Sequence, residues 1–162
     1  MRTCPFLILL ASPFAHAADI GITETTGIGL AIGVPTGLTG KWFLDPGKGI
    51  TVHMETRYDR AGLRVQYESD IAELGKDLNG THRLHLVGGV VAEVGDHLTR
   101  TGVAAGLGWS YRLSDAPLEI YTDIQSAIFP VTQSFGVYNQ NGLFDYVGAL
   151  GARWYFARQS SS

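Results

Sequence analysis

The sequence predicts an all-β fold, an eight-stranded antiparallel up-and-down β-barrel, on three observations. Apolar and polar residues alternate with period two along most of the chain, which is the pattern of strands with two different faces. Glycine is abundant, at 21 residues, and is scattered among β-branched and aromatic residues rather than in a collagen repeat. Short turn-forming segments separate the alternating stretches, and short links make successive strands antiparallel neighbours.

The alternation gives the positions of the strands. They are expected at 27–34, 38–44, 50–58, 62–70, 82–94, 100–112, 117–129 and 143–156. Only two links are long, near 71–81 and 130–142, and the first contains a helix-tolerant stretch at 70–77. No domain boundary or internal repeat interrupts the series, so 162 residues predict one domain.

The first 17 residues have the three parts of a secretory signal peptide in the right order. Arg2 gives the positive start, residues 6–11 form an apolar run, and Ala15-His16-Ala17 is a small-x-small cleavage site. The apolar run is too short for a membrane-spanning helix. We therefore expect an exported chain with a signal peptide at 1–17, a barrel domain at 18–156 and a C-terminal tail at 157–162.

Composition excludes several classes of function. The only cysteine, Cys4, lies in the signal peptide, so a mature chain has no disulfide scaffold, zinc-thiolate site or cysteine nucleophile. The net charge of −3 gives no basic surface for nucleic acid. Charged residues make up only 17% of the chain, below the usual quarter, and 11 of these 27 residues lie on one face of the predicted strands.

The two faces of the predicted strands differ in chemistry. One face is apolar and carries Ile28, Leu30, Ile32, Val34, Leu38, Trp42, Leu44, Ile50, Val52, Met54, Leu63, Val65, Tyr67, Leu84, Leu86, Val90, Val103, Leu107, Trp109, Tyr111, Leu118, Ile120, Ile124, Ile128, Phe144, Tyr146, Leu150, Trp154 and Phe156. The other face is charged and carries Lys41, His53, Glu55, Arg57, Arg64, Gln66, Glu68, His85, Glu93, Arg112, Glu119, Asp123, Gln125, Asp145 and Arg153. It also carries small residues: Gly29, Ala31, Gly33, Ala104, Gly106, Gly108, Ala149 and Gly151.

This pattern fits a soluble barrel with an apolar interior or a membrane barrel with the faces inverted. The small residues favour the membrane barrel, because a narrow lumen filled by Arg and Glu side chains needs space on some walls. The charged face is also nearly balanced, with six carboxylates against five cations, as buried charges must be. We therefore predict a transmembrane barrel.

Aromatic residues support the same prediction. If both chain ends face the periplasm, an aromatic girdle gathers at the periplasmic interface, formed by Trp42, Trp109, Tyr111, Trp154 and Phe156. Tyr58, Phe144 and Tyr146 would then lie nearer the outer interface.

The charged face supplies the candidate site, a lumen charge network. Its predicted members are Lys41, His53, Glu55, Arg57, Arg64, Glu68, Arg112, Glu119, Asp123, Asp145 and Arg153. Small barrels are filled by side chains, so these residues are expected to form a salt-bridged core. The alternative is a gated polar path for ions.

Three segments resemble a group of small, functionally uncharacterised outer-membrane β-barrel proteins. They are Gly33-Val34-Pro35-Thr36-Gly37-Leu38-Thr39-Gly40-Lys41-Trp42, Ala116-Pro117-Leu118-Glu119-Ile120-Tyr121 and Gly151-Ala152-Arg153-Trp154-Tyr155-Phe156. The resemblance implies an eight-stranded barrel akin to the OmpA membrane domain or OmpX, without catalytic residues. It also implies that Phe156 is the terminal aromatic of a signal read by the barrel-insertion machinery.

The sequence shows no catalytic, cofactor or metal site. A hydrolase needs a nucleophile beside a general base, and neither Ser110 nor Ser126 has a histidine near it in sequence. His82 and His85 lie three apart, which puts them on opposite faces of a strand and argues against a ligand pair. We expect neither cofactor nor metal.

These observations predict a non-enzymatic outer-membrane protein with a structural or surface-interaction role. The expected partners are outer-membrane lipid, the insertion machinery and an extracellular partner at the 130–142 loop, where Phe135 and Tyr138 could anchor it. Two alternatives stay open: a soluble periplasmic lipocalin-like barrel that binds a small apolar ligand, and a lipid-modifying outer-membrane barrel enzyme.

Overall fold

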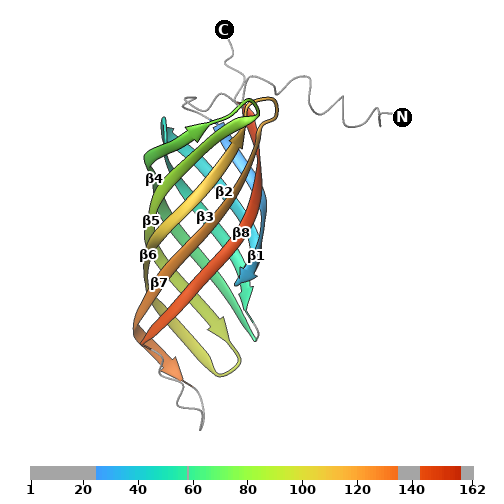
Figure 1. Ribbon diagram of the computed structural model, residues 1–162. Helices are drawn as coiled ribbons and strands as arrows, with labels where there is room; N and C mark the ends of the chain where they lie inside the picture. Colours follow the sequence, from blue (N-terminus) through green and yellow to red (C-terminus); the bar gives the residue numbers. More distant parts are fainter. Residues whose placement is uncertain (1–24, 58, 135–142, 158–162) are drawn as a thin grey trace, which may run out of the picture.

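Eight antiparallel strands pair in sequence order and close into a barrel in the computed structural model (Figure 1). The structure describes residues 25–57, 59–134 and 143–157. The strands are β1 (Thr25–Val34), β2 (Thr36–Asp45), β3 (Lys48–Arg57), β4 (Arg60–Lys76), β5 (Gly80–Gly95), β6 (Leu98–Leu113), β7 (Leu118–Ser134) and β8 (Phe144–Ala157). The predicted all-β, eight-stranded, up-and-down order is confirmed.

The first and last strands close the sheet. Gly27 of β1 lies opposite Lys41 of β2 on one side and opposite Tyr155 of β8 on the other. We call the end where β1 begins and β8 ends the terminal end, and the opposite end the distal end. Closure gives most backbone N–H and C=O groups a partner in an adjacent strand, which is the requirement for a sheet in an apolar medium.

Two predicted strand ends are wrong by more than two residues, and in both cases the predicted strand is too short. β4 extends to Lys76, so the long link predicted at 71–81 is a three-residue turn, and the helix-tolerant stretch at 70–77 is mostly strand. Pairing with β5 as far as Lys76 opposite Thr81 overrides the local helix propensity of this segment. Register shifts at Asp70/Ala72 and Glu73/Gly75 accommodate the irregular alternation there.

β7 is likewise longer than predicted and continues to Ser134. The sequence predicts that a loop begins at Pro130, but this residue lies in β7 where the register with β6 shifts between Thr101 and Val103. A register irregularity tolerates proline because one N–H is released from the ladder there. Of the 130–142 loop, residues 135–142, including Phe135 and Tyr138, lie outside the described residues.

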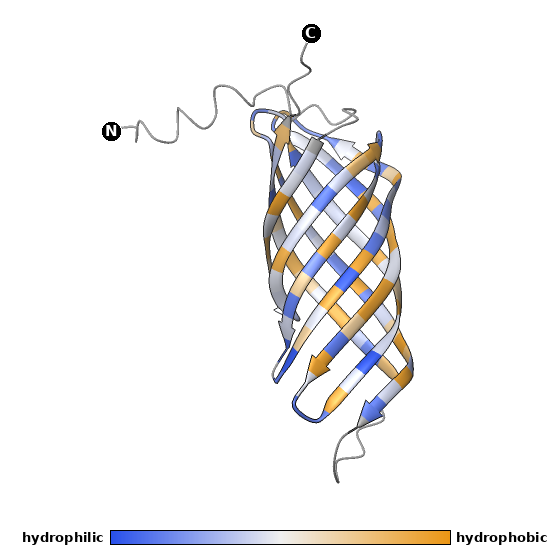
Figure 2. Ribbon diagram, turned by 180° about the vertical axis from the view of Figure 1, so that it is seen from behind, coloured by the Kyte–Doolittle hydropathy of each residue, from blue (hydrophilic) through white to orange (hydrophobic). Residues whose placement is uncertain are grey.

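The barrel has an apolar outer wall and a charged interior. Apolar and polar residues alternate along the strands nearest the viewer in Figure 2, as a two-faced wall requires. Every residue of the predicted apolar face is exposed or half-buried, and every charged or amide residue of the predicted charged face is buried except Arg57 and Asp145, which are half-buried. Of the glycines predicted on that face, Gly108 and Gly151 are buried, Gly29 and Gly106 are half-buried, and Gly33 is exposed. The inward face also carries Ala31, Ala104 and Ala149, all buried. Within the described residues, no helix has the length and apolar character to cross a membrane.

A tight turn joins β2 to β3 at the terminal end. Pro46 and Gly47 occupy its two central positions, and Gly47 has a φ of 72°, in the region that favours glycine. The Gly47 carbonyl accepts a hydrogen bond of 2.7 Å from the Asp70 N–H, so this turn also fixes the neighbouring strand β4.

We predict that Gly47→Ala destabilises the barrel by about 1–2 kcal/mol, because an L residue is strained at this φ. A Cβ at Gly47 would also lie 3.0 Å from Asp70 Oδ2. Gly75→Ala is the matched control, since a Cβ there meets nothing within 4 Å. Denaturant unfolding followed by tryptophan fluorescence measures both variants. Equal effects at the two positions would contradict the assignment of strain to Gly47.

Candidate functional site

Glu119 is the hub of the charged interior near the terminal end. Arg112 Nε donates to its Oε1 at 3.0 Å and Arg153 Nη1 donates to its Oε2 at 3.1 Å. Lys41 Nζ lies 3.6 Å from Oε1, and the Tyr155 hydroxyl donates to Oε2. These partners come from β2, β6 and β8, so one carboxylate on β7 joins strands on different sides of the lumen.

Glu68 is the second shared carboxylate. Lys41 Nζ donates to its Oε1, while Thr51 Oγ1 donates to Oε2 at 3.0 Å. Arg153 Nη1 reaches Oε2 at 3.5 Å and its Nε donates to Thr39 Oγ1 at 3.1 Å. Lys41 and Arg153 thus bridge Glu68 and Glu119, and all four side chains are buried.

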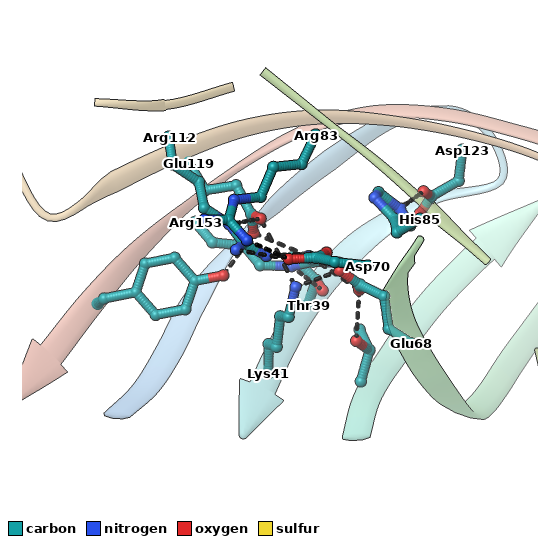
Figure 3. Close-up of polar contacts among 12 residues, drawn as sticks. Thr39, Lys41, Glu68, Asp70, Arg83, His85, Arg112, Glu119, Asp123 and Arg153 are labelled. Carbon is teal, nitrogen blue, oxygen red and sulfur yellow. Dashed lines mark hydrogen bonds and ion pairs between the residues drawn. The ribbon is translucent and has the colours of Figure 1, made fainter. Parts of the chain in front are cut away.

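Asp70 and Arg83 extend this arrangement toward the terminal end. Asp70 Oδ2 accepts hydrogen bonds from Arg112 Nη1 at 2.9 Å and from Arg83 Nη1 at 3.1 Å. Arg83 also lies 3.5 Å from the exposed Glu73. We call the seven charged residues joined in this way the terminal cluster: Lys41, Glu68, Asp70, Arg83, Arg112, Glu119 and Arg153 (Figure 3).

The middle of the lumen holds two further polar pairs. His85 Nε2 lies 2.8 Å from Asp123 Oδ1, and both side chains are buried. In Figure 3 the His85 ring lies between Asp123 on one side and Asp70 and Glu68 on the other. The Gln66 and Gln125 amides bond to each other, with Gln66 Nε2 at 2.5 Å from Gln125 Oε1.

The distal end has its own ion pairs. Arg64 Nη2 donates to Glu55 Oε2 at 2.8 Å, and Arg100 Nε donates to Glu93 Oε2 at 2.8 Å. Arg57 and Arg100 both donate to Asp145 Oδ2, at 2.7 Å and 2.5 Å. A shallow hollow beside these pairs has no room for a water molecule and is lined by Pro35, Glu55, Arg57, Arg60, Ala61, Gly62 and Glu93.

Glycines on the inner wall provide the space that these side chains occupy. A Cβ at Gly27 would lie 2.5 Å from the Tyr155 ring, and one at Gly151 would lie 2.5 Å from the Tyr121 ring. A Cβ at Gly108 would lie 2.0 Å from His85 Nε2 and 2.1 Å from Asp123 Oδ1. These small inward residues therefore make room for the large side chains of the residues paired with them on the adjacent strands.

Sequence reasoning missed several members of the interior. Asp70, Arg60, Arg83 and Arg100 join the ion pairs, although they were not among the predicted charges. Period two would have found Asp70 and Arg100, because they share the parity of Glu68 and Arg112. It would also have placed Tyr121 and Tyr155 inside, where Arg153 stacks on the Tyr121 ring at 3.7 Å. An aromatic side chain is typical of the apolar face, so its type alone does not indicate that Tyr121 and Tyr155 point inward.

The predicted girdle residues lie on the outer wall toward the terminal end. Trp42, Trp109, Tyr111, Trp154 and Phe156 are all exposed or half-buried and lie near the terminal ends of β2, β6 and β8. Phe144 and Tyr146 lie on the outer wall at the distal end, whereas Tyr58 lies outside the described residues.

His82 joins the girdle from β5. Its ring packs against Tyr111 at 4.6 Å and Trp109 at 5.6 Å between centroids. Asp77, in the turn between β4 and β5, lies 3.4 Å from His82 Nε2 and accepts a hydrogen bond of 3.0 Å from the Tyr111 hydroxyl. Hydrogen bonds from Asn79 N–H, Tyr111 and Gly80 N–H lower the pKa of the Asp77 carboxyl below its usual value.

The positions of the histidines and serines bear on whether the barrel could bind a metal ion or hold a hydrolase triad. His82 and His85 are on opposite faces of β5, as predicted, so they are not a ligand pair. His85 instead lies with Glu68 and Asp70, and one ligand atom from each residue lies within 4.8 Å of the others. The Ser110 hydroxyl is buried without a hydrogen-bond partner, and Ser126 is exposed opposite Tyr146 of β8.

Comparison of the chain with family models, with curated proteins and with solved structures gives no match. The resemblance of the first hairpin and of the segments at 116–121 and 151–156 to small outer-membrane barrels therefore stays a prediction. The fold itself is the closed eight-stranded barrel described above.

We predict that Glu119→Gln destabilises the barrel by about 3–5 kcal/mol, because it leaves buried Lys41, Arg112 and Arg153 short of a counter-charge. Glu73→Gln is the matched control, since Glu73 is exposed and pairs with Arg83 only at 3.5 Å. The control is expected to change the free energy of unfolding by less than about 1 kcal/mol. Denaturant midpoints compare the variants, and a Glu119→Gln effect no larger than the control would refute the hub role.

Proposed function

We propose that this chain is a non-enzymatic outer-membrane β-barrel protein with a structural role, exported by a signal peptide and anchored in lipid by its outer wall. The observation that carries the proposal is the inverted packing. Apolar side chains cover the outside, while Lys41, Glu68, Arg112, Glu119 and Arg153 are buried in the lumen.

The outer wall is too apolar for a water-exposed surface. On β1 alone, Ile28, Leu30 and Ile32 are 59%, 63% and 62% exposed, and apolar residues continue around the barrel on all the other strands. Soluble monomers rarely expose a contiguous apolar patch of more than a few hundred Å². A bilayer would cover this wall and remove the cost of its exposure to water.

Strand length and aromatic placement agree with a bilayer. A tilted strand needs about 9–11 residues to cross the hydrocarbon region, and the strands here have 10 to 17 residues. The girdle at the terminal end, with Phe144 and Tyr146 at the distal end, matches the two interfacial belts of outer-membrane barrels. This arrangement supports lipid as the main partner and periplasmic chain ends. Phe156 on the outer wall is compatible with recognition by the insertion machinery.

The filled lumen supports a structural role over a pore or a ligand carrier. A lipocalin-like barrel would need an apolar interior, whereas the buried apolar clusters of the described residues are small: one of Val91, Ala104, Ala127 and Phe129, and one of Ala31, Tyr121 and Ala149. Ion pairs from many strands occupy much of the described interior. A surface-interaction role would depend on the 130–142 loop, most of which lies outside the described residues.

The residues of the outer wall give little support to the alternative function, a lipid-modifying enzyme. Such an enzyme needs a serine beside a histidine at the lipid-facing rim. His82, the histidine that joins the outer girdle, contacts Trp109, Tyr111 and Asp77. Ser126 lies on β7 of the outer wall, opposite Tyr146 and Ala105.

We predict that the expressed protein fractionates with outer membranes and needs detergent for extraction. Unboiled samples should migrate faster in gels than boiled samples, because the closed barrel resists detergent until it is heated. Membrane fractionation and paired gel lanes measure these two properties. Recovery in the soluble periplasmic fraction without detergent would exclude the proposal.

A second prediction separates lipid from water as the surroundings of the outer wall. Ile124→Arg, at the middle of β7 and 72% exposed, should destabilise the inserted barrel by about 2–4 kcal/mol, since the arginine would face hydrocarbon. Leu78→Arg is the matched control, because Leu78 is 96% exposed in the β4–β5 turn, beyond the strands. Unfolding from lipid vesicles in denaturant gives both values. A soluble barrel would tolerate both substitutions, and that result would contradict lipid contact at Ile124.

A further inference from the structure

We propose that His85, Glu68 and Asp70 form a luminal site for a divalent transition-metal ion, with Zn²⁺, Ni²⁺ and Cu²⁺ preferred over Mg²⁺ and Ca²⁺. Strand pairing brings the three residues together. Asp70 of β4 lies directly opposite His85 of β5, and Glu68 lies two residues earlier on the same inward face. One ligand atom from each residue lies within 4.8 Å of the others, which is close enough for a shared ion.

The hydrogen bonding of His85 leaves one ring nitrogen available as a ligand. Its Nε2 lies 2.8 Å from Asp123 Oδ1, so the neutral ring that donates from Nε2 has its lone pair on Nδ1. Nδ1 is buried without a hydrogen-bond partner. A metal-bound histidine usually donates its other N–H to a carboxylate in this way. A buried acceptor that lacks a partner is costly, and coordination of an ion removes that cost.

Each carboxylate has one oxygen firmly held by cations and one held more loosely. Lys41 binds Glu68 Oε1, whereas Oε2 receives Thr51 at 3.0 Å and Arg153 only at 3.5 Å. Asp70 Oδ2 receives Arg83 and Arg112, whereas its Oδ1 receives only Arg112 Nη2, at 3.4 Å. The loosely held oxygens, Glu68 Oε2 and Asp70 Oδ1, are the ligand atoms we assign. The cations orient both carboxylates as outer partners.

The surrounding charge determines which ions the site takes. The cations of the terminal cluster, Lys41, Arg83, Arg112 and Arg153, are balanced by Glu68, Asp70, Glu119 and Asp123. A divalent ion adds positive charge, so we expect weaker binding than at a structural zinc site. Arg83 is 24% exposed and can turn toward solvent, which would lower the positive charge beside Asp70. Ions that gain from an imidazole ligand overcome the remaining repulsion better than Mg²⁺ or Ca²⁺.

The test uses the purified protein in detergent micelles, prepared without a histidine tag, with Co²⁺ as a spectroscopic probe. We expect one Co²⁺ per chain, a visible absorption spectrum typical of low coordination number with nitrogen and oxygen ligands, and displacement by Zn²⁺ but not by Mg²⁺ or Ca²⁺. Calorimetric titration with Zn²⁺ gives the dissociation constant. Failure of the wild-type protein to bind Co²⁺ or Zn²⁺ would overturn the proposal.

Variants then locate the site. His85→Ala and His85→Gln should abolish the spectrum, and Asp123→Asn should weaken Zn²⁺ binding by about 10–100-fold, because Asp123 orients the ring. His82→Ala is the matched control, since it removes the surface His82–Asp77 pair and leaves the lumen intact. Heat-modifiable gel mobility selects the variants that fold. Binding retained in a folded His85 variant, or lost in His82→Ala, would show an adventitious surface ion only and refute the luminal site.

Discussion

The structure depends on one constraint: charges that are buried in the lumen must find partners there. Backbone ladders join each strand only to its two neighbours, whereas several of the ion pairs join strands that are not neighbours. Lys41 of β2 contacts Glu68 of β4 and Glu119 of β7, and Arg153 of β8 contacts both carboxylates. The interior also determines where small residues are needed in the wall. Gly27 is paired with Tyr155, and Gly108 is paired with His85, because a Cβ at either glycine would collide with the long side chain beside it.

The same ion pairs specify register more than they add stability. Replacing a buried salt bridge with apolar residues is often neutral or stabilising, so the terminal cluster is weak evidence for a large favourable energy. A slip of one residue in one strand, however, would turn its whole inward set outward. In β7 such a slip would move Glu119 and Asp123 out of the lumen, which would remove the Asp123 partner of His85 and leave Arg112 with Asp70 alone. Ion pairs at several positions along the barrel axis therefore favour the correct strand register.

Much of this arrangement could be predicted from the sequence, because a strand has only two faces and charge marks one of them. Lys41 beside Trp42, and Arg153 beside Trp154, are sufficient to orient β2 and β8. What could not be predicted is which charges meet. Arg64 pairs with Glu55 of the adjacent strand, whereas Lys41 reaches Glu68 two strands away, and only the stagger of the closed sheet decides this. Likewise, the meeting of Glu68, Asp70 and His85 depends on the register of β4 with β5, which the sequence does not reveal. Residues 70–77 have a helix-tolerant composition, and their strand conformation depends on pairing with residues of β5.

The unequal strand lengths at the terminal end have a consequence for association between molecules. β4 continues to Lys76, but its pairing with β3 ends at Ser69 opposite Lys48, so residues 71–76 present a one-sided edge among the described residues. A straight edge of this kind recruits strands from other chains. Here the two register shifts make the edge irregular, and the exposed Glu73 and Lys76 add charge to it. The rim is thereby protected against edge-to-edge association between molecules.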